Sequence, residues 1–174
     1  MTARAPLLIR ATSIAVAIAR AKSAAIEHCG VLLIGASGAG KSDLALRLID
    51  GCPYGETRLI ADDYTTLAFR DGAWRAGAPR GIAGAIEVRG VGIVAAEHIS
   101  EAPLICVFDL DAVPERMPPS REFHLSGNSN SKTPSAPLFA LAPFEASAPS
   151  KIRAALRAIR YGLFREFRHD YRNC

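Results

Sequence analysis

The chain has 174 residues, enough for one domain with a single well-filled core. A hydrophobic content of 49% excludes an intrinsically disordered chain, and no apolar run reaches the ~18 residues that a membrane-spanning helix needs. The formal net charge of +4 arises near the C-terminal end, because residues 151–174 carry seven Lys or Arg against two Asp or Glu. Such a segment can bind a nucleic acid or an anionic protein, or be only a solvated helix face.

The four cysteines are scattered, and none belongs to a Cys-x-x-Cys pair or to a Cys/His cluster with metal-binding spacing. They are Cys29, Cys52, Cys106 and Cys174. This spacing favours reduced, structural thiols, and we therefore expect a cytoplasmic protein. We expect neither a membrane nor a nucleic acid among its partners.

The first expected strand is the apolar segment Thr12–Ile18. Arg4 and Arg10 precede it, so the segment also resembles the charged start and apolar core of a secretory signal. We interpret it as a buried strand, because cleavage after such a core would leave the next strand almost at the new N-terminus. The Ala-rich stretch from there to Glu27 fits either a helix or a long connection.

A glycine-rich turn stands between an expected strand, Val31–Ile34, and an expected helix, Lys41–Ile49. The turn fits the Walker A pattern Gly-x-x-x-x-Gly-Lys-Ser, and strand, turn and helix in this order are the context that supports such a motif. The glycines let consecutive N–H groups and the positive end of the helix face the same phosphates. The expected phosphate-binding residues are Gly35, Ala36, Ser37, Gly38, Ala39, Gly40, Lys41 and Ser42.

The last two residues of this motif have the chemistry of a nucleotide site. Lys41 can reach the β- and γ-phosphates, and the Ser42 hydroxyl can ligate Mg²⁺. The sequence therefore predicts a protein that binds a nucleoside triphosphate together with Mg²⁺.

The middle of the chain alternates short apolar segments with turns. Residues 51–55 break the first helix, and Asp71-Gly72 is a hairpin signal that follows a segment alternating like an edge strand. Surface loops are expected at 113–119 and 126–137. The expected strands are Arg58–Ala61, Tyr64–Phe69, Ala73–Ala76, Ile86–Val88, Leu104–Leu110 and Leu138–Leu141.

A basic C-terminal helix is expected over about 150–172. Its apolar residues recur at steps of three and four, and most of its arginines avoid that stripe. The stripe consists of Ile152, Leu156, Ile159 and Leu163.

Two of the expected strands end in carboxylates, which a phosphoryl-transfer site needs to orient the nucleophile and to ligate Mg²⁺. One strand ends at Asp62-Asp63, and the other reaches Asp109 and Asp111. Spacing alone does not choose between the two strands. Asp109 and Asp111 also fit the structural role of capping a loop, and we favour that role for them.

Three segments resemble the HPr kinase/phosphorylase family: the phosphate loop with its helix (35–48), Ala61-Asp62-Asp63, and Ile86-Glu87-Val88-Arg89-Gly90-Val91-Gly92-Ile93. They follow the family's order at comparable spacing. The segment at 143–153 is similar to the short alphaproteobacterial form, which consists of the catalytic C-terminal domain only. The resemblance implies one catalytic domain over 1–174, with a P-loop kinase-like α/β fold, a central mixed sheet and a C-terminal helix.

The resemblance also implies roles for the acidic motif and the signature segment. Asp63 matches the carboxylate that takes the seryl proton when a protein serine attacks ATP, and that returns a proton in the reverse phosphorolysis. Asp62 matches a metal or positioning group, and Glu87 a second Mg²⁺ ligand. Arg89 lies in the segment that serves both reactions.

Two positions depart from the family pattern. Arg10 stands where the family places a His, before the segment Ala11-Thr12. No clean match exists for an arginine in a late Gly-Arg-Asn motif. The candidate substitutes are Arg121, Lys132 and Lys151.

These observations predict an ATP-dependent serine kinase that acts on HPr or a related phosphocarrier of the bacterial phosphotransferase system, and they leave open the reverse phosphorylase reaction. ATP and Mg²⁺ are the expected cofactors, and the family implies a homo-oligomer. The alternatives are a small-molecule P-loop kinase and a nucleotide-sensing regulatory module without catalysis. Turnover with a panel of carrier proteins separates the three.

Overall fold

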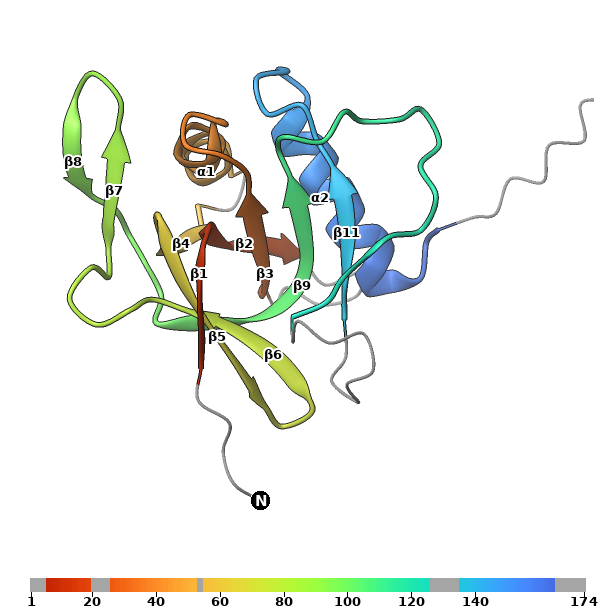
Figure 1. Ribbon diagram of the computed structural model, residues 1–174, viewed down its shortest axis with the longest axis horizontal. Coiled ribbons are helices and arrows are strands. Elements are labelled where there is room, and N and C mark those ends of the chain that lie inside the picture. The colour runs from red at the N-terminus through yellow and green to blue at the C-terminus, as the bar shows by residue number, and fades with distance from the viewer. Residues whose placement is uncertain (1–5, 20–25, 53–54, 126–134, 165–174) are drawn as a thin grey trace, which may run out of the picture.

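The computed structural model describes residues 6–19, 26–52, 55–125 and 135–164 (Figure 1). They form one large sheet, a separate two-stranded ribbon and two helices. The strands are β1 (Leu7–Arg10), β2 (Thr12–Ala19), β3 (Ile26–Ile34), β4 (Arg58–Ala61), β5 (Tyr64–Arg70), β6 (Ala73–Gly77), β7 (Ala85–Val88), β8 (Gly92–Ala95), β9 (Glu101–Asp109), β10 (Glu122–Phe123) and β11 (Ala136–Ala140). The helices are α1 (Lys41–Asp50) and α2 (Ala148–Tyr161).

The large sheet is mixed, which confirms the predicted α/β class. Its strand order is β1-β5-β6-β9-β3-β2-β4, and β11 pairs with β9 and carries β10. β9 runs parallel to β3 and to β11, whereas the other pairs are antiparallel. The carboxyl ends of β3 and β9 therefore meet at one edge of the sheet, next to the glycine-rich turn.

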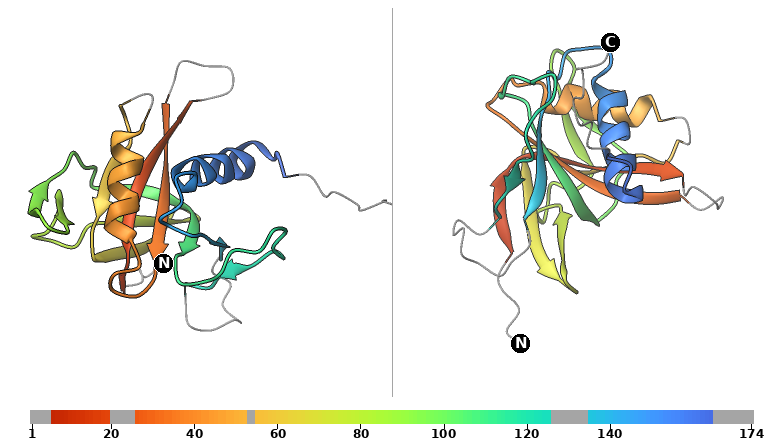
Figure 2. Two further views of the ribbon diagram at one scale, coloured as in Figure 1. Left: turned by 90° about the horizontal axis from the view of Figure 1, so that it is seen from above. Right: turned by 90° about the vertical axis from the view of Figure 1, so that its right-hand side faces the viewer.

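The central strands are apolar on both faces because both faces are covered. On one face Ile14, Val16 and Leu33 join a buried cluster with the apolar residues of α1 and α2. On the other face Leu32 joins a second cluster with residues of the β5–β6 hairpin. The helices thus lie on one side of the central strands and the hairpin on the other (Figures 1 and 2).

The second cluster contains Trp74, the one tryptophan of the sequence. Trp74 lies on β6 and is only 5% exposed. Its ring meets Phe69 of β5 edge-on, with ring centroids 5.4 Å apart and an interplanar angle of 62°. Aromatic pairs favour this edge-to-face arrangement, so the contact holds the two strands of the hairpin together.

Most predicted strands are confirmed, and two predictions about their surroundings are wrong. Tyr64–Phe69 is not at an edge, because β1 pairs with the free side of β5. The loop predicted at 126–137 overlaps β11 at its end, where Ala136 pairs with Phe123. Residues 126–134 of that loop lie outside the described part of the chain, as do residues 20–25 of the ambiguous Ala-rich stretch.

The C-terminal helix is shorter than predicted. α2 ends at Tyr161, because Gly162 takes a left-handed conformation with φ 62° and donates its N–H to Ala158 O. Ile152 and Leu156 of the predicted stripe are fully buried, but Leu163 lies beyond the helix end and is mostly exposed. Residues 165–174 are outside the described part. None of the described helices is long and apolar enough to cross a membrane.

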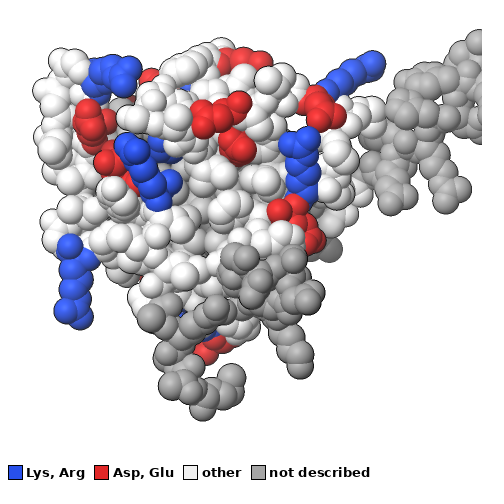
Figure 3. Space-filling model, viewed as in Figure 1, with Lys and Arg blue, Asp and Glu red and all other residues white. Residues whose placement is uncertain are grey.

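The basic side chains of α2 fasten this helix to the rest of the domain. Arg153 Nη2 donates to Leu48 O of α1 at 2.9 Å, and Arg160 Nε lies 2.8 and 2.9 Å from the two carboxylate oxygens of Glu27. Over the face seen in Figure 3, basic and acidic side chains are interspersed. Part of the positive charge of this helix therefore has structural partners within the domain itself.

Candidate active site

The turn between β3 and α1 forms a cradle of backbone N–H groups. Gly35 and Gly40 have φ values of 148° and 85°, which side-chain-bearing residues rarely adopt. A Cβ at Gly40 would also lie 2.9 Å from the ring of Phe144. Gly40 is the N-cap of α1, and no side chain of the described residues caps that end. The first N–H groups of the helix are therefore available to an anion.

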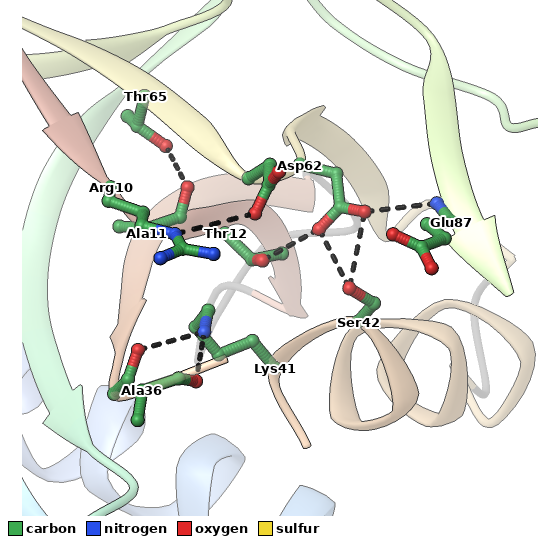
Figure 4. Close-up of polar contacts among 11 residues, drawn as sticks. Arg10, Ala11, Thr12, Ala36, Lys41, Ser42, Asp62, Thr65 and Glu87 are labelled. Atoms are coloured by element: carbon green, nitrogen blue, oxygen red, sulfur yellow. Dashed lines mark hydrogen bonds and ion pairs between the residues drawn. The ribbon is translucent and has the colours of Figure 1, made fainter. Parts of the chain in front are cut away.

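Lys41 lies inside this cradle, and the residue is only 7% exposed. Its ammonium group donates to Gly35 O at 2.8 Å and to Ala36 O at 2.7 Å. The N–H of Ala36 donates to Asp111 Oδ2 at 2.7 Å, so a carboxylate two residues beyond β9 fixes the start of the loop. The structure thus places a positive charge within the loop, as the Walker A pattern predicts (Figure 4).

Asp62 is the polar centre of the site. This carboxylate is 8% exposed and receives hydrogen bonds from three directions. Thr12 Oγ1 donates to Oδ1 at 2.7 Å, Ser42 Oγ lies 2.9 Å from Oδ1 and 3.2 Å from Oδ2, and the N–H of Glu87 donates to Oδ2 at 3.0 Å. Three donors compensate the cost of burying the charge, and they join β2, α1 and β7 at one carboxylate (Figure 4).

Asp63 differs from its neighbour, because its side chain is 60% exposed and lines the pocket in front of the phosphate loop. Its φ of 67° is unusual for a residue other than glycine, and Ala11 N–H donates to its carbonyl at 3.0 Å. Arg10 Nε lies 3.9 Å from Asp63 Oδ1. The strained turn therefore buries one carboxylate of the pair and directs the other to solvent, a division of the kind found at functional sites.

The pocket has a volume of about 310 Å³, at the lower end of the range for small-molecule sites. Its lining residues come from the phosphate loop and α1, from the acidic pair, from the end of β7 and from the loop before α2. Glu87 and Arg89 of the ribbon line it, opposite Lys41 and Ser42. The Glu87 carboxylate points toward Ser42 in Figure 4, and Arg89 Nη2 lies 3.7 Å from where a Cβ on Gly38 would stand.

These residues fit the cofactors that the sequence predicts. Ser42, Asp62 and Glu87 bring hydroxyl and carboxylate oxygens together, which are the ligand types that Mg²⁺ prefers. Lys41 and Arg89 supply positive charge on two sides of the cradle. Ser37, Gly38, Gly40, Lys41 and Ser42 of the phosphate loop thus line one pocket with Asp63, Glu87 and Arg89, and Asp62 accepts a hydrogen bond from Ser42 in its wall.

The carboxylates that follow the second strand do not line the pocket. Asp109 Oδ1 accepts hydrogen bonds from the N–H groups of Asp111 and Ala112 at 3.0 and 3.2 Å. Asp111 in turn accepts the N–H of Ala36. Both are loop caps, as we favoured from the sequence, and the contact with Ser42 belongs to Asp62.

The substitutes considered for the late arginine lie elsewhere. Arg121 Nη2 pairs with Glu115 at 3.2 Å, and Lys151 pairs with Glu145. The hydrogen bond from Lys151 lowers the pKa of the Glu145 carboxyl. Neither cation lines the pocket, and Lys132 lies outside the described residues.

Sequence reasoning missed two residues of the site. Thr12 gave no chemical signal, because a threonine at a strand start is ordinary and its bond to Asp62 spans fifty residues of chain. Phe144, which also lines the pocket, comes from the loop before α2. No local pattern connects that loop to the phosphate loop.

A mixed sheet, a glycine-rich loop leading into a helix, and a buried carboxylate on the loop serine define a phosphate-loop α/β protein. Residues 18–102 match the family model described as the HPr Serine kinase C-terminal domain. The matched stretch includes the phosphate loop, the acidic pair and the β7–β8 ribbon, so this part of the chain is similar to that domain.

Curated relatives are similar to part of the chain. The chain is 42% identical over 69 residues to the HPr kinase/phosphorylase of Clostridium botulinum, and 43% identical over 65 residues to that of Clostridium novyi. These alignments span 40% and 37% of this chain but only 21% and 20% of the relatives' length. The solved structure of the Hpr(Ser) kinase/phosphatase from Coxiella burnetii shares the fold, with a TM-score of 0.65 at 19% identity over 90% of this chain and 98% of that one.

Proposed function

We propose that this protein is an ATP-dependent protein serine kinase that phosphorylates HPr or a related phosphocarrier. The observation that carries the proposal is the exposed Asp63 carboxylate in the same pocket as Lys41 and Ser42 of the phosphate loop. The domain family and the names of the curated relatives support the same activity.

The chemistry follows from the positions of the side chains. Lys41, Arg89 and the first N–H groups of α1 would bind the phosphates and stabilise the charge that develops during transfer. Asp63 would accept the proton of the attacking serine hydroxyl, since its side chain is open to an incoming protein substrate. Asp62 would hold Ser42 in place. Mg²⁺, bound near Ser42 and Glu87, would neutralise phosphate charge.

Phosphorolysis of phosphoserine is a second candidate, because the curated relatives are named as both kinase and phosphorylase. In that direction an oxygen of inorganic phosphate attacks the phosphorus of the phosphoserine and forms pyrophosphate, the bond from phosphorus to the serine oxygen breaks, and that oxygen needs a proton from Asp63. Arg10, the residue beside Asp63, has a guanidinium with N–H donors and no acceptor atom. It can orient the carboxylate but cannot relay a proton to it, and we therefore propose that the kinase direction dominates.

The β7–β8 ribbon favours a protein substrate over a small molecule. Val91 and Ile93, at and beside its turn, are 74% and 78% exposed. The ribbon also supplies Glu87 and Arg89 to the pocket. Apolar side chains exposed at the rim of a site are typical of surfaces that contact another protein.

The proposal is tested by incubating the purified protein with radiolabelled ATP, Mg²⁺ and a panel of HPr-like carriers. Label on a carrier serine that disappears in the Asp63→Asn variant supports it. Label only on a small molecule would indicate a small-molecule kinase, and tight ATP binding without transfer would indicate a nucleotide sensor. Release of pyrophosphate from phosphoserine-carrier and phosphate measures the reverse reaction. We propose a cytoplasmic homo-oligomer, which light scattering can test for the oligomeric state.

A further inference from the structure

Phe144 is an exposed aromatic ring at the edge of the phosphate pocket. The residue is 71% exposed, and it lines the pocket together with Asp43 and Leu46 of α1. The ring lies against the phosphate loop, because a Cβ on Gly40 would be 2.9 Å from its Cζ and 3.0 Å from its Cε1. One part of the ring thus touches the loop and the rest faces the open pocket.

The loop that carries Phe144 is held from both sides. Arg47 of α1 donates from Nη2 to Pro143 O and from Nη1 to Glu145 O at 3.2 Å. The same guanidinium donates from Nε to Asp43 Oδ2 at 3.0 Å, which fixes its orientation. The two carbonyls that flank Phe144 are therefore tied to the helix that follows the phosphate loop. The exposed position of the ring is built into the fold.

The ring does not serve the core. Phe144 belongs to neither of the two buried clusters of the described residues. A large apolar side chain that is fixed in solvent beside a polar cradle gains little for folding. The exposed Phe144 ring is instead placed so that a flat, apolar group of a ligand could stack on its face.

We propose that Phe144 is the stacking platform for the base of the nucleoside triphosphate. The inference rests on the proposed nucleotide binding and adds the residue that recognises the base. Phosphates bound at the start of α1 leave the sugar and base to extend along the pocket, and Leu46, Val88 and Phe144 are its apolar lining. Stacking on an aromatic face does not read the edge of the base, so adenine and guanine should both be accepted.

The test compares ligands with and without a base by calorimetry on the full chain in the presence of Mg²⁺. In Phe144→Ala the Kd for ATP and for GTP should rise by roughly 5- to 150-fold, the range expected when an aromatic stacking partner is truncated. The Kd for inorganic tripolyphosphate, which has no base, should stay the same. Phe144→Tyr should keep wild-type affinity for ATP, and Phe144→Leu, which keeps apolar bulk without a planar face, should lose affinity.

Two further variants distinguish the stacking role of Phe144 from nucleotide binding itself, on which the stacking role depends. Lys41→Ala should weaken binding of ATP and tripolyphosphate alike, and Phe164→Ala, which removes an exposed ring that does not line the pocket, should change neither. Equal ATP affinity of wild type and Phe144→Ala would overturn the stacking role and leave nucleotide binding intact. An equal loss for ATP and tripolyphosphate in Phe144→Ala would also overturn it, in favour of support for the loop. No ATP binding by the wild type would overturn both proposals.

Discussion

Replacing Thr12 by Val should destabilise the protein measurably, although the two side chains have nearly the same shape. Thr12 is fully buried, and its hydroxyl donates to Asp62 Oδ1 at 2.7 Å. A hydrogen bond to a charged group contributes about 1.5–3 kcal/mol. In a chain of this length each kcal/mol corresponds to about 2–4 °C, so the melting temperature should fall by roughly 3–12 °C.

The assay is a double-mutant cycle in urea, with Thr12→Val and Asp62→Asn alone and combined. Because the strength of the bond depends on the charge of Asp62, Thr12→Val should cost clearly less in the Asp62→Asn background. Thr65→Val is the matched control, since Thr65 is equally buried and its hydroxyl contacts only Ala11 O and Ser13 Oγ among the described residues, both at 2.9 Å. Additive effects of Thr12→Val and Asp62→Asn would refute the reasoning.

Lys41→Ala should abolish tight Mg-ATP binding in calorimetry while the circular dichroism spectrum stays that of the wild type; an unchanged Kd would argue against a phosphate-binding role. Asp63→Asn should keep ATP affinity but slow transfer to the carrier by ~10²–10⁴, the usual loss for a general base, and full activity would contradict the assignment. Val91→Ser with Ile93→Ser should raise KM for the carrier and leave KM for ATP unchanged, whereas equal changes in both would count against a docking role. Burial raises the pKa of the Cys29 thiol to about 12 from an ordinary value of 9.0, so the folded state keeps this proton while the unfolded chain loses it. Stability should therefore decline as pH rises from about 9 to 12, and Cys29→Ala should make that decline shallower in urea titrations.

The parts of the site that the sequence predicts are those whose signal is local. Strand, glycine-rich turn and helix follow one another without interruption, so the motif alone is enough to assign Lys41 and Ser42. The choice of Asp62 over Asp109 needs the family resemblance, because both carboxylates end apolar strands. The structure shows the physical difference between them. Among the described residues, the Ser42 hydroxyl makes its hydrogen bonds to Asp62 and not to Asp109.

The parts that the sequence does not predict depend on contacts between distant segments. β1 has four residues, too few for a clear alternation, and it exists because β5 offers a free edge. The end of α2 is set by the left-handed turn at Gly162, which a continuing stripe of apolar residues conceals. The place of Phe144 beside Gly40 depends on Arg47, whose bonds to the loop around Phe144 carry no pattern in the sequence.

The location of Trp74 has a practical consequence for spectroscopy. As the one tryptophan, it dominates intrinsic fluorescence, and it lies in the core on the far side of the central strands from the helices. Its emission should report the packing of the β5–β6 hairpin and stay constant when the pocket on the other side fills. Unfolding and nucleotide binding can therefore be followed in one cuvette as separate optical signals, with a fluorescent ATP analogue as the second chromophore.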